Sequence, residues 1–181
     1  MFFDIIVRKV IKMKKLGLTH KHLLLYIITL LVVVIGDQIT KMIVDHTLQL
    51  NGSYTIIDNF FYFTYSHNKG AAWGMLQGHM YLFYVISFIA AAGMVYYFME
   101  SKEYQKLYRF GLVLVFSGML GNLIDRVFYG YVRDFIDFII LGYDFPIFNV
   151  ADMAICLGVG LILLEVGIEE YKIWKQSKLN A

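Results

Sequence analysis

Four long apolar runs divide the chain. A membrane-spanning helix needs about 20 predominantly apolar residues, and each run is close to that length. The third run is somewhat short, so it needs the residues around Asp125 to complete a crossing. The pattern therefore predicts four membrane helices, at about residues 23–44, 80–99, 110–124 and 150–166.

The segment between the first two runs has a different pattern. Residues 54–57 and 60–65 are β-branched and aromatic, and Asn-Gly and Asp-Asn turns bound them, which favours short strands. Aromatic side chains are stable where a membrane meets water. We expect a small β-platform at that interface. Residues 67–74 follow it and are too small and too rich in glycine for a strand.

Composition agrees with a mainly α, polytopic membrane protein. Hydrophobic residues make up 59% of the chain and charged residues 17%, with a mean hydropathy of +0.62. Soluble domains are about half apolar and about a quarter charged. No linker or repeat interrupts the chain. We therefore expect one membrane domain, residues 23–168, between a basic N-terminal segment, residues 1–22, and a C-terminal tail, residues 169–181.

The basic N-terminal segment has two interpretations. Its six Lys and Arg residues alternate with apolar residues, which fits an amphipathic helix on an anionic membrane surface. It fits equally well a dispensable extension that precedes Met13. The first apolar run is not followed by the small-residue cleavage site of a signal peptide, so we expect it to be an uncleaved anchor.

The positions of Lys and Arg predict the topology. Six precede the first run, three lie between the second and third, and three follow the fourth, whereas the other two connectors are longer and carry two each. Cytoplasmic segments of membrane proteins are enriched in Lys and Arg. Both termini are therefore expected in the cytoplasm, and the acidic residues next to the third and fourth runs on the outer side of the membrane.

Two of these acids, Asp134 and Asp152, suggest catalysis. Asp134 follows the third run across a turn containing Gly130, and Asp152 opens the fourth, so antiparallel helices can bring their carboxylates together. Two close carboxylates do not both ionise readily, so one keeps a proton while the other acts as a base toward water. Such a pair can hydrolyse a peptide bond. A structural alternative stays open, because Asn149 and Asp152 also suit the cap and first turn of a helix.

Other polar residues have simpler interpretations. Asp37 and Lys41 are four residues apart and can pair on one helix face. Asp125 and Arg126 suit pairing with polar groups at the interface, and Asn68 and Gly70 can hold an extended peptide. Asp137 lies one turn from Asp134 if that segment is helical, and Asp144 suits a turn. The lone Cys156 and the scattered His residues give no zinc-ligand spacing.

Five motifs in this order resemble the bacterial lipoprotein signal peptidases, also called signal peptidase II. The resemblance covers roughly residues 13–174. The motifs are Asp37-Gln38-Ile39-Thr40-Lys41, Asn68-Lys69-Gly70-Ala71-Ala72-Trp73-Gly74, Gly121-Asn122-Leu123-Ile124-Asp125-Arg126, Val132-Arg133-Asp134-Phe135-Ile136-Asp137 and Phe148-Asn149-Val150-Ala151-Asp152.

The resemblance implies an intramembrane aspartyl endopeptidase with four membrane helices and no metal or cofactor. Its substrate would be a prolipoprotein cut before a cysteine that carries diacylglycerol, and the cyclic peptide globomycin would inhibit it. The resemblance also implies a location in the inner membrane of a bacterial cell. We expect a monomer that contacts membrane lipids and binds no nucleic acid. By resemblance, Asp134 and Asp152 are catalytic. The residues implied to bind substrate or support the site are Asp37, Lys41, Asn68, Gly70, Asn122, Asp125, Arg126 and Asn149.

Arg133 departs from the family pattern, because many members have an apolar residue before the first catalytic Asp. It could turn toward Asp134 and lower the pKa of that carboxyl, or it could point to lipid headgroups. Two rival functions remain. Intramembrane carboxylates also carry protons in transporters, and Ser66 with Lys69 could form a Ser/Lys peptidase, although nothing near Lys69 suggests a desolvating pocket.

Overall fold

The structure, a computed structural model, describes residues 20–70 and 78–179. Within them, four helices are long and apolar enough to cross a membrane, as expected. The expected amphipathic helix lies mostly outside the described residues. The helices are α2 (His20–Thr47), α3 (Met80–Glu100), α4 (Lys106–Tyr129) and α5 (Val150–Leu179).

The helices are longer than the apolar runs that predicted them. α4 begins before residue 110 and ends at Tyr129, so Asp125 and Arg126 lie inside the helix rather than after it. Gly130 ends α4 in the left-handed conformation, with φ of 76°, which glycine adopts at little cost. α5 continues without a break past residue 168 to Leu179. The proposed tail is therefore helical over most of its length.

A four-stranded antiparallel sheet accompanies the helices. Its strands, in spatial order, are β1 (Ser53–Ile57), β2 (Phe61–Asn68), β3 (Val132–Ile140) and β4 (Tyr143–Asp144). β1 and most of β2 were expected, whereas β3 and β4 were not. β2 also includes His67 and Asn68, although the sequence predicts no strand over residues 67–74. Asp137 lies in a strand, so the expectation of a helical turn between it and Asp134 was wrong.

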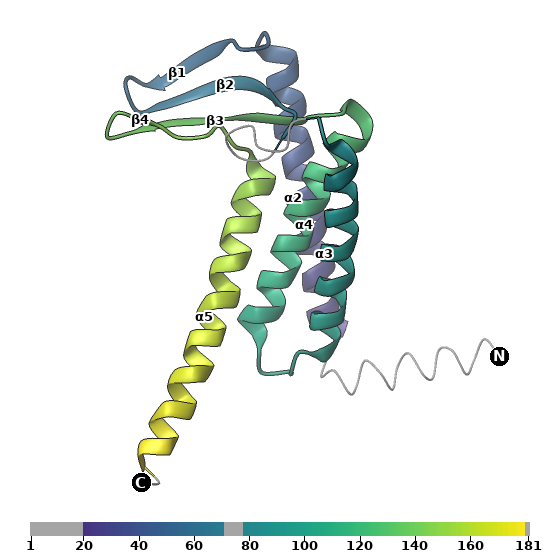
Figure 1. Cartoon of the computed structure of the whole chain (residues 1–181), viewed down its shortest axis with the longest axis vertical. Coiled ribbons are helices and arrows are strands. Elements are labelled where there is room, and N and C mark those ends of the chain that lie inside the picture. The colour runs from purple at the N-terminus through teal and green to yellow at the C-terminus, as the bar shows by residue number, and fades with distance from the viewer. Residues whose placement is uncertain (1–19, 71–77, 180–181) are drawn as a thin grey trace, which may run out of the picture.

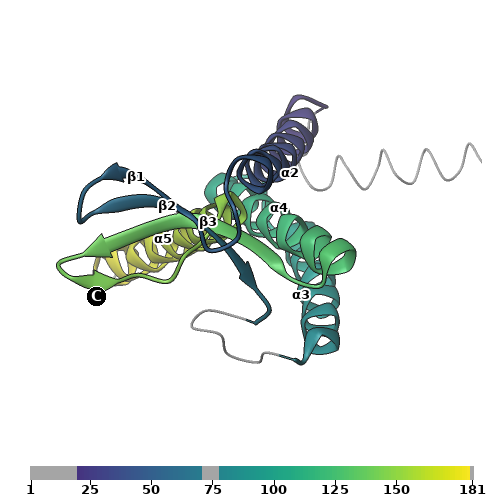
Figure 2. The same ribbon diagram turned by 90° about the horizontal axis from the view of Figure 1, so that it is seen from above.

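The sheet lies at one end of the helix bundle, and the start of α2 and the end of α5 lie at the other (Figure 1). Seen from above, the sheet extends sideways over α5, which diverges from the other three helices (Figure 2). A small apolar cluster joins the sheet to α2. It contains Val44 of α2, Tyr65 of β2 and Phe135 of β3, all buried. The cluster holds β2 and β3 against the helix end.

Small residues pack α4 against α5. Gly111 on α4 faces Gly158 on α5, and a Cβ on Gly158 would lie only 2.6 Å from the carbonyl oxygen of Gly111. Small side chains let membrane helices approach this closely. Because the backbones are close, Asn122 of α4 reaches Asp152 of α5, with 2.7 Å between Nδ2 and Oδ1.

We expect Gly158→Ala to lower the thermal stability of the detergent-solubilised protein. The added methyl group meets backbone that cannot move freely, and overpacking of this kind costs about 1–3 kcal/mol. Gly160 is the control, because a Cβ there meets no atom within 4 Å. Thermal unfolding should show a lower Tm for Gly158→Ala and an unchanged Tm for Gly160→Ala. Equal Tm values for the two variants would contradict this packing.

Candidate active site

A cavity of about 740 Å³ opens where β2, β3, α4 and α5 meet. It is large enough for several residues of an extended peptide. Its wall combines polar side chains from all four elements with an apolar segment, residues 145–148, that connects β4 to α5. The predicted site residues on its wall are Asn68, Gly70, Asn122, Arg126, Asp134 and Asp152.

Asp134 lies near the start of β3 and is only 3% exposed. Both of its carboxylate oxygens accept hydrogen bonds. Asn149 Nδ2 donates to Oδ1 at 2.6 Å, and Asn68 Nδ2 donates to Oδ2 at 2.9 Å. Burial, together with the negative charge of Asp152, raises the pKa of Asp134 to about 7. Asp134 therefore retains its proton near neutral pH in a substantial fraction of molecules.

Asp152 occupies the third position of α5, three residues after the capping residue Asn149. The backbone N–H of Asn149 donates to Asp152 Oδ2 at 3.1 Å, and the backbone N–H of Asp152 donates to Asn149 Oδ1 at 3.1 Å. This reciprocal pair is a capping box, as the structural alternative had suggested. The other carboxylate oxygen of Asp152, Oδ1, accepts a hydrogen bond from Asn122 Nδ2. The Asp152 side chain also lines the cavity.

Asn149 and Asn122 connect the two carboxylates. Asn149 contacts both, through its side-chain amide to Asp134 and through its backbone to Asp152. Asn122 Oδ1 accepts from Asn149 Nδ2 at 3.1 Å and from Lys41 Nζ at 3.0 Å. Because two donors face this oxygen, the side-chain nitrogen of Asn122, Nδ2, must face Asp152. The network thus fixes the orientation of the groups beside the carboxylates.

A buried ion cluster supports this network from α2 and α4. Lys41 Nζ lies 2.8 Å from Asp37 Oδ2 and 3.5 Å from Asp125 Oδ2, and all three side chains are fully buried. The expected pairing of Asp37 with Lys41 is confirmed. Asp37 Oδ1 also accepts from the backbone N–H of Ala151 at 2.9 Å. The cluster therefore ties α2 to the first turn of α5, which carries Asp152.

Arg133 takes neither of the two positions expected for it. Its side chain is 1% exposed and turns away from both Asp134 and the lipid. Nη2 donates to Asp125 Oδ1 at 2.8 Å and to Gln38 Oε1 at 3.0 Å, and Nε donates to Asp125 Oδ2 at 3.2 Å. Successive residues of a strand point to opposite faces, so Asp134 faces the cavity while Arg133 faces α4. With Arg133 included, the buried ion cluster contains two cations, Lys41 and Arg133, and two anions, Asp37 and Asp125.

Arg126 lines the same cavity as the two carboxylates. Its guanidinium stacks over the ring of Phe83 at 4.5 Å, and Nη2 donates to the carbonyl oxygen of Gly70 at 3.3 Å. Asn68 Oδ1 accepts from the backbone N–H of Gly70 at 2.9 Å. These contacts place an amide, a backbone turn and a cation around one side of the cavity.

Some residues lie elsewhere than expected. Asp137 accepts a hydrogen bond from the Thr64 hydroxyl and does not line the cavity. Asp144 lies in β4 and lines the cavity. Sequence reasoning also missed the cavity wall at residues 145–148. The signal was present in the aromatic residues around Pro146, which pair with β3 through an Ile136–Phe148 bridge. Among the described residues, no group of His, Cys, Asp and Glu is suited to hold a metal ion.

Several proteins with known names are similar to this chain in sequence. The lipoprotein signal peptidase of Halalkalibacterium halodurans is 41% identical over 154 residues, which cover 85% of this chain and 99% of the relative. That of Bacillus pumilus is 43% identical over 147 residues, or 81% of this chain and 95% of the relative. That of Staphylococcus aureus is 46% identical over 132 residues, or 73% of this chain and 81% of the relative.

Solved structures share the fold. One bacterial membrane enzyme, determined by the in meso method at 2.3 Å, superposes with a TM-score of 0.76 and 42% identity over 80% of this chain and 88% of that one. Another, determined at 1.9 Å, has a TM-score of 0.72 and 43% identity over 78% and 91%. A family model described as signal peptidase (SPase) II matches residues 28–168. The chain therefore belongs to the signal peptidase II family of aspartic-type peptidases.

Proposed function

We propose that the protein is an intramembrane aspartyl endopeptidase that removes signal peptides from prolipoproteins, with Asp134 and Asp152 as its catalytic pair. One observation carries the proposal. Both carboxylates line a single cavity and share Asn149 as a hydrogen-bond partner. The raised pKa of Asp134 supports a division of roles, in which Asp134 is the acid and Asp152 the base.

The reaction needs only these two groups and water. The Asp152 carboxylate takes a proton from water as the water oxygen attacks the scissile carbonyl carbon, and Asp134 donates its proton to the carbonyl oxygen. The resulting tetrahedral diol then collapses. The amide nitrogen takes the proton held by Asp152, the C–N bond breaks, and one diol hydroxyl returns a proton to Asp134. The products are a carboxylic acid and a free amine, and both Asp residues return to their initial states.

The substrate is a prolipoprotein whose cysteine already carries diacylglycerol. The cavity lies at the sheet end of the helices, where a lipid-anchored peptide bond can reach it while the acyl chains stay in the bilayer. Asn68, Gly70 and Arg126 line the cavity beside the carboxylates and offer hydrogen bonds to an extended peptide. Inhibitors of the globomycin type would occupy the same cavity. A single chain contributes all of these groups, which supports a monomeric enzyme.

Membership of the family supports a bacterial inner-membrane location, and the distribution of Lys and Arg supports a cytoplasmic position for both termini. The start of α2 and the end of α5 lie at the same end of the bundle, opposite the sheet (Figure 1). The sheet and the cavity then face the outside of the membrane, where the signal peptides of exported lipoproteins arrive.

A proton-carrying transporter is the rival function, and the distribution of charge argues against it. Residues 110–124 of α4 contain no charged side chain, nor do residues 23–36, 80–99 and 153–164 of the other helices. At 1.5 Å of rise per residue, a stretch of 12 to 20 residues spans about 18–30 Å. A proton relay through the membrane would need ionisable groups within that distance.

Cleavage should decline above about pH 7, because Asp134 must carry a proton to act as the acid. Its pKa of about 7 predicts that kcat/KM falls toward tenfold per pH unit on the alkaline side. The measurement is a pH profile of cleavage in detergent. A profile that stays flat between pH 6 and pH 9 would exclude Asp134 as the acid.

Stability should follow the same titration. The pKa of Asp134 is higher in the folded protein than its ordinary value of 3.8, so the folded state binds more protons than the unfolded state between about pH 4 and pH 7. The stabilising contribution of this proton is complete below pH 4 and is lost as the pH rises toward 7. The Tm of Asp134→Asn should therefore rise relative to wild type over this range. A constant difference in Tm would contradict the raised pKa.

The proposed function is tested by a gel-shift assay. Purified protein in detergent is mixed with a diacylglyceryl-modified prolipoprotein, with and without globomycin. We expect cleavage before the lipidated cysteine, and we expect globomycin to prevent it. The same precursor without diacylglycerol should be cut much more slowly. Absence of cleavage by a well-folded sample would exclude the proposal and make proton flux in liposomes the next measurement.

A further inference from the structure

The sheet has two hairpin turns, and their side chains differ in kind. The β1–β2 turn carries Asp58 and Asn59, and Asn59 has a positive φ of 58°. The β3–β4 turn consists of Leu141 and Gly142, with φ of 51° and 81°. Both turns therefore use the left-handed conformation, but only the first one places a polar residue there.

Leu141 is an unusual residue for its position. A two-residue turn with positive φ at both residues strongly prefers Asn-Gly, Asp-Gly or Gly-Gly, and leucine is strained in this conformation. Its side chain is also fully exposed within the described structure, at 104% of the reference area. In water, Leu141 would combine backbone strain with an unburied apolar side chain. An apolar environment around the turn would remove the free-energy cost of exposing the leucine side chain to water.

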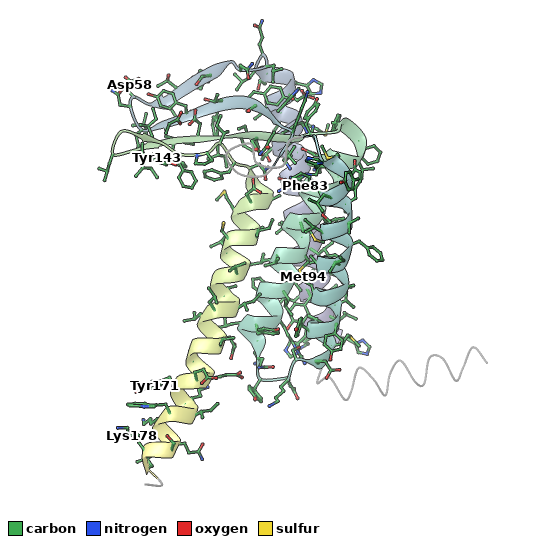
Figure 3. All side chains as sticks on the ribbon, in the orientation of Figure 1. Asp58, Phe83, Met94, Tyr143, Tyr171 and Lys178 are labelled. Atoms are coloured by element: carbon green, nitrogen blue, oxygen red, sulfur yellow. The ribbon has the colours of Figure 1, made fainter. Side chains whose placement is uncertain are left out.

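The residues around the turn extend the same apolar surface. Ile140, Tyr143 and Phe145 are each at least 40% exposed. Between residues 138 and 148, Asp144 is the only charged residue. Tyr143 lies on the side of the sheet toward the helices, whereas Asp58 lies on the side away from them (Figure 3). The apolar turn and the polar turn thus belong to opposite edges of the sheet.

The apolar turn lies at the end of the sheet that extends sideways away from the helices (Figure 1). β4 forms the edge of the sheet nearest the helices (Figure 1). The chain passes from β4 through residues 145–148 directly into α5, whose first turns expose Met153 and Leu157. These side chains belong to a helix apolar enough to cross a membrane, so they face lipid. The exposed apolar side chains around Leu141 therefore extend the apolar surface of α5 to one side, along the hairpin.

We propose that the tip of the β3–β4 hairpin, formed by Ile140, Leu141 and Tyr143, inserts into the lipid leaflet to the side of the helices. The partner is the boundary between headgroups and acyl chains. That region accepts aliphatic side chains, and it suits the amphipathic ring of Tyr143. The hairpin continues into residues 145–148, which line the cavity. The tip therefore sets the depth of one cavity wall relative to the bilayer.

Single-cysteine spin labelling tests this insertion directly, without an activity assay. Cys156 is the one cysteine of the chain, and it is exposed on α5, so a label on the unmodified protein gives the reference for lipid. Leu141→Cys and Asn59→Cys are made in a Cys156→Ala background, and Asn59 gives the reference for water. Labelled proteins are reconstituted into phosphatidylcholine–phosphatidylglycerol vesicles, with a nickel chelate on both sides.

We expect the label at 141 to collide several-fold less often with the chelate than the label at 59, and to collide readily with oxygen, as at 156. Chelate collisions at 141 equal to those at 59 would overturn the proposal. Protection of the 141 label from both oxygen and chelate would also overturn it, because protein rather than lipid would then cover the tip.

A second variant tests whether Leu141 itself holds the tip in the lipid. Here the label is placed at Tyr143→Cys, with and without Leu141→Asn. Asparagine suits the turn conformation better than leucine does, so the hairpin should remain folded. We expect chelate collisions at 143 to increase several-fold when Leu141 is replaced. Unchanged collisions would show that Leu141 does not anchor the hairpin.

Discussion

Asp134→Asn and Asp152→Asn should each reduce prolipoprotein cleavage by a factor on the order of 10⁴, the upper end of what a positioned acid or base contributes. Asparagine at 134 has no acidic proton to donate, and asparagine at 152 cannot accept one from water. Neither change alters side-chain volume appreciably, so both variants should insert and fold. The measurement is the single-turnover rate of cleavage in detergent, with circular dichroism as the check on folding.

Asp137→Asn is the matched control for this pair. Asp137 lies on the same strand as Asp134, but it is bonded to Thr64 and does not line the cavity. The control should therefore keep a near-normal rate. If Asp134→Asn or Asp152→Asn also cleaved at a near-normal rate, the assignment of the catalytic pair would be wrong.

Asp152→Glu separates catalysis from helix capping. A capping box accepts Glu at the third helical position, so this variant should keep the stability of α5. Its carboxylate, however, is displaced by one methylene group, and a misplacement of about 1 Å can cost 10²-fold in rate. We expect a Tm close to wild type with cleavage at least tenfold slower. A fully active Glu variant would mean that Asp152 acts mainly as a cap.

Local patterns predicted much of this site. The spacing of Asp37 and Lys41 predicted their ion pair, and the sequence from Asn149 to Asp152 predicted the helix cap. Each of these depends only on residues within one turn of a helix, where geometry is regular. The four membrane helices were predictable for a similar reason, since the lipid environment requires long apolar segments whatever their neighbours are.

Contacts between distant segments were not predictable in the same way. The run from Val132 to Ile140 is apolar enough for a strand or a buried helix, and only its pairing with β2 decides between them. The direction of Arg133 depends on that choice, because strand alternation places it opposite Asp134. Its contacts with Gln38 and Asp125 join segments 95 and 8 residues away, so no local pattern specifies them.

The buried ion cluster explains why so many polar residues are needed beside only two carboxylates. The N–H of Ala151 binds Asp37, and Lys41 holds both Asp37 and Asn122. Asn122 in turn faces Asp152. Contacts of 2.7–3.0 Å therefore connect α2 to the first turn of α5. The cluster positions the site from behind, outside the cavity.

Lys41→Met should be the most destabilising substitution in this cluster. It removes the cation that lies between Asp37 and Asp125 and leaves Asp37 buried without an opposite charge. Breaking a buried ion pair from one side typically costs about 3–5 kcal/mol. We expect a large fall in Tm in detergent, together with slower cleavage, because Asn122 loses one of the two donors that orient its amide group.

Two further variants distinguish lost charge balance from lost packing. In the double variant Lys41→Met with Asp37→Asn, the uncompensated carboxylate is absent, so part of the lost stability should return even though one more native side chain has been changed. Lys69→Met removes an exposed Lys and should change the stability by no more than about 0.5 kcal/mol. If the double variant is no more stable than Lys41→Met alone, the loss comes from packing, and charge balance is not what holds α2 against the catalytic end of α5.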